Sequence, residues 1–181
     1  MKWLLLFIPF LSLSVNAATY QLPVKGADIL SGAEVQTGQK GTQGLVVVFV
    51  SAKCPCSDSH VVELQQLVHD FPEFEFVGIH SNADEELDLS MTYFDGKKLP
   101  FPVIQDQNSE LANQFKAYKT PHAFVLDREG HILYQGGVTD SAQFSRSNKK
   151  YLREALEDLQ AKRPIRTAEG RTLGCVIARS R

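Results

Sequence analysis

The sequence predicts an α/β fold with a mixed central sheet, in which parallel strands and a C-terminal antiparallel hairpin are flanked by helices. Strand-like and helix-like segments alternate between residues 45 and 115, a rhythm typical of a parallel sheet with right-handed crossovers. Two further strand-like runs are then separated only by a short polar segment containing Gly130, and so short a connection indicates a hairpin. A length of 181 residues favours one domain.

The first 17 residues have the pattern of a secretory signal peptide. Lys2 supplies the positive start, residues 3–13 the apolar stretch, and Val15-Asn16-Ala17 a small-residue cleavage site. The alternative is a membrane anchor, but a spanning helix needs about 20 apolar residues and this stretch has roughly half that number. We therefore expect a secreted or periplasmic protein that begins near Ala18 and has no stable membrane insertion after cleavage.

Charge and cysteine content narrow the class of function. The formal net charge is −2, which gives no basic surface of the kind that nucleic-acid binding requires. Export would place the three cysteines in an oxidising compartment, where disulfides persist. An odd count leaves at least one thiol unpaired within a monomer. The cysteines are therefore interpreted as functional rather than as a structural framework.

Residues 18–44 are expected to form a short edge hairpin or an irregular lead-in, and 45–50 the central strand. The run Leu45-Val-Val-Val-Phe-Val50 has no polar face, as is typical of a strand buried on both sides. The helix that follows is expected at about 57–70, with Ser57, Asp58 or Ser59 as its N-cap. Phe71-Pro72 ends it, because proline cannot continue a helix.

The remaining elements follow from the same patterns of periodicity and turn residues. Acidic residues in a first turn favour a helix at 84–94, and a polar cap favours a short one at 109–115. One apolar stripe, spaced at 3.6 residues, predicts a closing helix at about 148–161. The other strands are expected at 74–79, 103–104, 123–126 and 132–134. Residues 162–181 form a tail with the third cysteine.

Cys54 and Cys56 stand where the buried strand passes into its helix. The start of a helix carries a partial positive charge and free N–H groups, which favour a thiolate over a thiol. Lys53 adds to that positive field, whereas Asp58 opposes it. The alternative is an inert buried cysteine, but polar neighbours and a position outside the apolar run argue against burial of Cys54, so this segment points to thiol chemistry with Cys54 as nucleophile.

The segment from Leu45 to His60 resembles the active-site strand, loop and helix of the thioredoxin-like superfamily. It is most similar to the redoxin branch, which includes exported thiol–disulfide oxidoreductases and the alkyl hydroperoxide reductase/thiol-specific antioxidant proteins. The order of elements extends the resemblance over residues 45–161. The sequence departs from the family motif C-x-x-C, because Ser57 occupies the second cysteine position and Cys56 precedes it.

The resemblance also implies roles for two residues elsewhere in the chain. Thr120-Pro121 stands before a strand, where members of the superfamily have a cis proline against the active-site cysteine, and Pro121 would shape the groove that receives the partner. Gly174-Cys175-Val176-Ile177 is similar to the C-termini of exported redoxin-like proteins. The 13 residues from Lys162 to Cys175 can span roughly 43 Å, so Cys175 can return to the site as a redox partner or as a structural staple.

The histidines and metal-binding possibilities are less specific. His60 and His122 lie near the expected site, but a packing or surface role is favoured for each over the tuning of a thiolate. Cys54, Cys56 and His60 together have the softness that suits Cu(I), although their spacing matches no specific ligand motif. The sequence therefore assigns no metal and no cofactor.

These residues favour the hypothesis that the protein is an exported thiol–disulfide oxidoreductase. The Cys54 thiolate attacks a disulfide of a protein substrate, and Cys56 or Cys175 resolves the mixed disulfide. One alternative is a thiol peroxidase, in which a Cys54 sulfenic acid condenses with Cys175; the pattern P-x-x-x-T-x-x-C of peroxiredoxins is missing. A copper carrier or redox-inactive adaptor on the same fold is the alternative from another class. The oligomeric state does not follow from the sequence.

Overall fold

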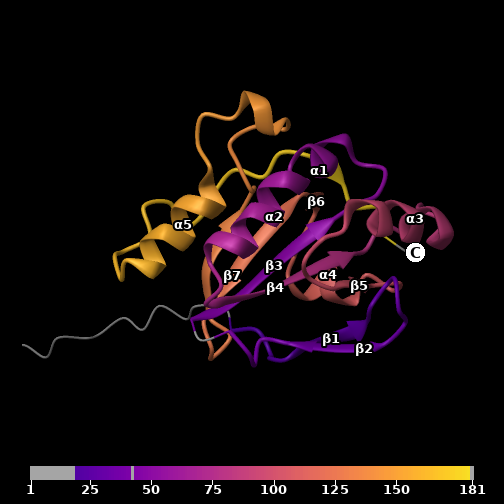
Figure 1. Ribbon diagram of the computed structural model, residues 1–181, viewed down its shortest axis with the longest axis horizontal. Coiled ribbons are helices and arrows are strands. Elements are labelled where there is room, and N and C mark those ends of the chain that lie inside the picture. Colours follow the sequence, from indigo (N-terminus) through magenta and orange to yellow (C-terminus); the bar gives the residue numbers. More distant parts are fainter. Residues whose placement is uncertain (1–18, 42, 180–181) are drawn as a thin grey trace, which may run out of the picture.

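The computed structural model describes residues 19–41 and 43–179 (Figure 1), so the expected signal peptide at 1–17 lies outside the described residues. Its central sheet has five strands in the order β5-β4-β3-β7-β8. Strands β3, β4 and β5 are parallel, whereas β7 is antiparallel to both β3 and β8. The predicted mixed sheet is thus confirmed. The strands are β3 (Gly44–Val50), β4 (Phe74–His80), β5 (Val103–Gln105), β7 (His122–Leu126) and β8 (Ile132–Gly136).

Strand β3 is buried along its whole length, as its uninterrupted apolar sequence predicts. Because side chains alternate across a strand, it contributes to two cores. Val46, Val48 and Val50 face the core that contains residues of α2 (Val61–Asp70), α3 (Leu87–Lys97) and α5 (Tyr151–Gln160). Leu45, Val47 and Phe49 face the core beside α4 (Glu110–Gln114). The cysteine loop therefore follows a strand that packing fixes from both sides.

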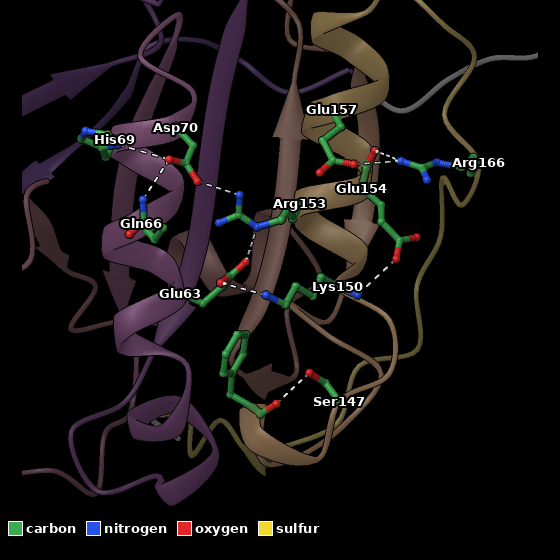
Figure 2. Close-up of polar contacts among 11 residues, drawn as sticks. Glu63, Gln66, His69, Asp70, Ser147, Lys150, Arg153, Glu154, Glu157 and Arg166 are labelled. Atoms are coloured by element: carbon green, nitrogen blue, oxygen red, sulfur yellow. Dashed lines mark hydrogen bonds and ion pairs between the residues drawn. The ribbon is translucent and has the colours of Figure 1, made fainter.

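Helices α2 and α5 are joined by ion pairs on the outside of the sheet (Figure 2). Arg153 Nε lies 2.7 Å from Glu63 Oε1, and its Nη1 lies 2.7 Å from Asp70 Oδ2. Lys150 Nζ lies 3.7 Å from Glu63 Oε2. Glu63 is buried, so its carboxylate needs these cationic partners to offset the loss of water. The hydrogen bond from Arg153 also holds the pKa of Asp70 well below its usual range.

The helix after the cysteines begins earlier than expected. Helix α1 (Pro55–Ser59) follows Cys54 directly, and Cys54 is the N-cap, with its Sγ accepting a hydrogen bond from the Ser57 amide at 3.4 Å. The expected caps Ser57, Asp58 and Ser59 are therefore wrong. Proline is favoured at the first helical position because its φ is preset and it lacks an N–H that would need a partner. A break at His60 separates α1 from α2.

The two later helices begin later than expected. Helix α3 begins at Leu87 rather than at 84, because the carboxylate of Glu85 is directed into the cysteine loop. Helix α5 begins at Tyr151 rather than at 148, since Asn148 N donates to Asp140 Oδ1 and is engaged outside the helix. A 3-10 helix, η1 (Phe144–Arg146), precedes it. No helix of the described residues is both long and apolar enough to cross a membrane.

The N-terminal lead-in forms a hairpin of its own. Strands β1 (Val24–Ala27) and β2 (Glu34–Thr37) pair antiparallel in a separate two-stranded sheet. A bridge from Asp28 to Ile104 and a 2.8 Å hydrogen bond from Ile29 N to the Val103 carbonyl attach the hairpin to β5. Of the two expectations for this segment, the hairpin beside a sheet edge is the one observed.

The C-terminal tail runs along β8 and then across the end of the sheet. Gln135 N donates to the Ala168 carbonyl at 3.0 Å, and Gly170 N donates back to the Gln135 carbonyl at 2.9 Å. Further on, β9 (Cys175–Val176) pairs antiparallel with β6 (Lys119–Thr120), so that Cys175 lies opposite Thr120. These contacts return the tail to the cysteine loop.

Candidate active site

Three thiols meet at the end of β3. The Sγ atoms of Cys54, Cys56 and Cys175 all lie within 4.8 Å of one another, and all three cysteines are free. Cys54 is only 2% exposed, so the expectation that it is not buried is wrong: the Thr120 carbonyl lies 3.2 Å from its Sγ and helps to cover it. Cys56 and Cys175 are partly buried. Cys54 caps α1 and Cys56 lies in its first turn, while Cys175 arrives on β9. The structure thus brings together all three cysteines that the sequence singled out.

Gly174 allows the tail to approach this closely. A Cβ atom at this position would lie 2.0 Å from the Thr120 carbonyl oxygen, a distance that no side chain could occupy. Three residues later, Ile177 is buried in the core and its N–H donates to the Tyr118 carbonyl at 3.1 Å. In the Gly-Cys-x-Ile segment, the glycine permits contact and the isoleucine anchors the tail, which holds Cys175 between them.

The Thr120–Pro121 peptide bond is cis, as the resemblance implied. Thr120 touches the central thiol, since Cys54 Sγ lies 3.2 Å from the Thr120 carbonyl oxygen. The Thr120 hydroxyl is buried and has no hydrogen-bond partner among the described residues. It is therefore available to donate to Cys54 once that thiol has lost its proton. Thr120, which precedes the cis Pro121, therefore lines the site beside Cys54.

The environment favours the thiolate at Cys54. Burial acts to raise the pKa of Cys54, but the Cys175 thiol, the Thr120 hydroxyl, which can donate to the thiolate once it forms, and the Ser57 amide outweigh it, so that the pKa is lowered. Each of these donors stabilises the charged form directly. A lowered pKa is the property that makes a cysteine reactive.

The two neighbouring thiols shift in the opposite direction. Burial and the adjacent charge of Cys54 raise the pKa of Cys56. Burial, together with its hydrogen bond to Cys54, raises the pKa of Cys175 to about 12. The first proton that the three-thiol cluster loses therefore comes from Cys54. This asymmetry gives Cys54 the most readily ionised of the three thiols and leaves Cys175 as a thiol that holds its proton more strongly.

A buried carboxylate beneath the cysteine loop was missed by the sequence reasoning. Glu85 accepts hydrogen bonds from the Ala52 amide at 2.8 Å and from the Ser51 hydroxyl, and it lies 3.0 Å from His80 Nε2. Ser51 Oγ in turn accepts from the Cys54 amide at 3.1 Å. Burial raises the pKa of Glu85, but the hydrogen bonds from His80 and Ser51 outweigh it and the pKa is lowered.

Glu85 thus fixes the backbone that carries Cys54. The sequence assigned Glu85 to an ordinary helical first turn and gave His80 no role. One signal was available: His80 ends a parallel strand, and the carboxyl ends of parallel strands are where sites of α/β proteins gather. A polar residue there, followed by an acidic pair, would have indicated the network.

His60 is a packing residue, as favoured from the sequence. It is buried, with Nδ1 2.7 Å from the Cys56 carbonyl oxygen and Nε2 2.8 Å from Thr139 Oγ1. Burial lowers its pKa. Both ring nitrogens are engaged, and His60 is not part of the group of possible ligand side chains formed by Cys54, Cys56 and Cys175. The third soft group beside the two cysteines is Cys175.

His122 is buried beside two aromatic rings and should make stability sensitive to pH. Its ring centroid lies 4.4 Å from Phe124 and 5.2 Å from Tyr118, and Nδ1 has no hydrogen-bond partner among the described residues. Burial lowers its pKa to about 4. Between about pH 6.5 and 4 the unfolded chain binds a proton at this histidine that the folded chain does not, so acid favours unfolding.

We therefore expect His122→Phe to flatten the acid side of the stability profile. The contribution of His122 to the free energy of unfolding is complete above pH 6.5 and declines by about 3 kcal/mol towards pH 4. Phenylalanine keeps the ring contacts but cannot titrate. Urea denaturation at pH 7, 5.5 and 4 should give a difference between wild type and variant that changes by this amount. A parallel pair of profiles would contradict the assignment.

Comparison with known proteins identifies the family to which the chain belongs. The model of the AhpC/TSA family matches residues 16–135, whereas no curated protein gives a significant match. An uncharacterized conserved protein from Geobacillus kaustophilus has a similar structure, with 24% identity, a TM-score of 0.80 and coverage of 91% of this chain and 92% of that chain.

Two structures with named activities are also similar. Peroxidoxin BcpB from Mycobacterium tuberculosis has 19% identity and a TM-score of 0.61, over 81% of this chain and 97% of that chain. A secreted disulfide oxidoreductase from the same organism, homologous to Escherichia coli DsbE, has 17% identity and a TM-score of 0.53, over 61% and 80%. At these identities the likeness shows the thioredoxin-like fold alone. With well over half of its length matched by the family model, the chain belongs to the AhpC/TSA family.

Proposed function

We propose that this protein is an exported thiol–disulfide oxidoreductase that uses Cys54 as its nucleophile. The observation that carries the proposal is the cluster of three thiols within 4.8 Å, in which only Cys54 has a lowered pKa. Such a cluster holds a reactive thiolate and a neighbouring thiol that can later attack the mixed disulfide formed by Cys54. The cis Pro121 beside it supports a groove for an extended substrate segment.

The reaction proceeds in two displacement steps. The Cys54 thiolate attacks one sulfur of a substrate disulfide, forming a mixed disulfide as the substrate S–S bond breaks, and the departing sulfur takes up a proton. A second cysteine then loses its proton and attacks the Cys54 sulfur, which releases the other substrate thiol. The substrate gains two electrons and the protein loses two, stored as one disulfide. The same steps in reverse oxidise a dithiol.

Cys175 fits the resolving step better than Cys56 does. Cys54 and Cys56 are separated only by Pro55, and a disulfide between such close neighbours needs a distorted backbone. Cys175 lies on a separate strand, opposite Thr120, and its thiol hydrogen-bonds to Cys54. A Cys54–Cys175 disulfide closes a loop of about 120 residues, so it also stabilises the fold, by at most about 5 kcal/mol.

A disulfide map tests this assignment. Protein recovered from an oxidising compartment is alkylated without reduction, digested and analysed by mass spectrometry. We expect a linked pair of peptides containing Cys54 and Cys175, released by mild reductant, with Cys56 alkylated. A Cys54–Cys56 bond would transfer the resolving role to Cys56. If all three thiols are alkylated, or if the Cys175 disulfide resists reduction, the proposed mechanism with two cysteines is contradicted.

The family match also supports a second candidate, a thiol peroxidase. In that case Cys54 reduces a peroxide and becomes a sulfenic acid, which Cys175 converts to a disulfide with loss of water. Among the described residues, the partners of the Cys54 thiol are Cys175, Thr120 and the Ser57 amide, and none of them is an arginine that could polarise a peroxide. Peroxide consumption with a Cys54→Ser control distinguishes the two candidates; rapid consumption that depends on Cys54 would favour the peroxidase.

Export is part of the proposal and rests on the sequence of residues 1–17. Cleavage after Ala17 would release a chain that begins at Ala18. N-terminal sequencing of the protein from the periplasm or medium of an expressing bacterium should therefore read Ala-Thr-Tyr. Uncleaved protein retained in the cytoplasm would contradict the proposed export.

A further inference from the structure

We propose that the reduced protein binds one Cu(I) ion through the thiolates of Cys54, Cys56 and Cys175. This goes beyond thiol–disulfide exchange, which requires two cysteines at a time and gives the third no task. The three Sγ atoms lie within 4.8 Å of one another, although only two of them are neighbours in the sequence. A ligand that binds all three sulfurs at once would use the whole arrangement.

The spacing suits a metal bound at the centre of a triangle. Thiolate sulfur lies about 2.3 Å from a bound d¹⁰ metal such as zinc, so three sulfurs in one plane around such an ion lie about 4 Å apart. The observed upper limit of 4.8 Å leaves only small side-chain rotations to reach this geometry. The backbone can therefore remain as it is.

The identity of the ligands selects Cu(I). Soft thiolates favour Cu(I), zinc and iron–sulfur clusters, whereas zinc in structural sites takes four ligands in a tetrahedron. Among the described residues, no histidine or carboxylate joins the three cysteines within the same 4.8 Å. His60, the nearest candidate by sequence, has both ring nitrogens engaged. A three-sulfur site without a fourth protein ligand fits Cu(I) better than zinc.

The site is built before any ion arrives. The Ser57 amide fixes Cys54 Sγ, while pairing of β9 with β6 and the buried Ile177 fix Cys175. Cys54 is almost fully buried, but Cys56 and Cys175 are partly exposed. An ion can therefore enter from the side of those two thiols and complete its coordination at Cys54.

Binding exchanges protons for metal without a change in oxidation state. Copper stays as Cu(I), three Cu–S bonds form, and the protons still held by the thiols pass to the buffer. Because ligands must be deprotonated, affinity rises with pH. A Cys54–Cys175 disulfide removes two of the three ligands, so oxidation of the protein and copper binding exclude each other.

The test is a competition between the reduced protein and a chromogenic Cu(I) chelator under anaerobic conditions. We expect one equivalent of Cu(I) per chain in the wild type. Cys54→Ser, Cys56→Ser and Cys175→Ser should each weaken binding by more than about 100-fold, since even groups that only orient a ligand are worth 10–100-fold. X-ray absorption of the wild-type complex should show three sulfur neighbours. Circular dichroism confirms that each variant is folded.

Two histidine variants serve as controls. The variant His60→Gln should still bind one equivalent of Cu(I). The variant His131→Gln should do so too. It alters the other group of possible ligand side chains among the described residues, which consists of Asp127, Glu129 and His131. Loss of binding in either, or full binding by Cys175→Ser, would overturn the proposal. Thiol–disulfide exchange activity is measured on the same samples. Exchange activity without copper binding would contradict only the proposed copper site. Copper binding without exchange activity would contradict only the proposed oxidoreductase function.

Discussion

Replacement of Cys54 by serine is expected to slow thiol–disulfide exchange by at least about a thousand-fold, the scale seen when a covalent nucleophile is removed. A serine hydroxyl remains protonated at neutral pH, whereas the surroundings of Cys54 lower the pKa of its thiol. The side chain is 2% exposed, and serine is close to it in size, so the fold should tolerate the change. Reduction of a dye-labelled glutathione disulfide at pH 7 measures the rate.

The other two cysteines provide the matched controls. Cys56→Ser should keep the rate within about ten-fold, because Cys175 still resolves the mixed disulfide. Cys175→Ser should complete the first displacement and then stop, so that a covalent complex with a protein substrate accumulates on a non-reducing gel. If Cys56→Ser accumulates the complex instead, the resolving role belongs to Cys56. If Cys54→Ser retains its rate, the nucleophile is misassigned.

Glu85→Gln is expected to lower the free energy of unfolding by about 3 kcal/mol, as when one partner of a buried charged pair is removed. Glu85 accepts from the Ser51 hydroxyl and the Ala52 amide and faces His80. Glutamine has nearly the same shape, but its NH₂ group would face donors. One of them would then lose its partner inside the protein. Urea denaturation of the reduced protein measures the loss.

The adjacent residue offers a close control. Glu86 is exposed, and its side chain makes no cap hydrogen bond to α3, so Glu86→Gln should change stability by no more than about 0.5 kcal/mol. The difference between wild type and Glu85→Gln should also depend on pH. The pKa of Glu85 is lowered, so its contribution is present above about pH 4.3 and is lost as the pH falls through the folded-state pKa. Equal losses in both variants would mean that Glu85 has no special role.

The sequence by itself determined the elements whose signals are local. The uninterrupted apolar run at 45–50 became the central strand β3. The short polar connection around Gly130 joined β7 and β8 as an antiparallel hairpin. Such patterns are readable because periodicity and turn chemistry act over a few residues. The same locality identified Cys54, which stands between a buried strand and a helix.

Signals at helix starts were only partly readable. Several residues near Cys54 could each have acted as the cap, but Cys54 is the N-cap because Pro55 takes the first helical position. Likewise, Glu85 appeared as one acid of a helical first turn, whereas the structure uses its carboxylate to hold the cysteine loop. Where a residue has two possible partners, the residues that pack around it determine which partner it contacts. Those residues come from other parts of the chain, so the local sequence does not reveal the outcome.

Only the tertiary structure decided what surrounds the nucleophile. Chain length allowed Cys175 to return to Cys54, but the pairing of β9 with β6 and the close approach at Gly174 place it there. Position in the sequence suggested His60 as a soft ligand, yet its hydrogen bonds to the Cys56 carbonyl and Thr139 occupy both ring nitrogens. Proton affinities and ligand sets depend on atoms a few ångströms apart, and segments distant in the sequence reach such distances only when the whole chain has folded.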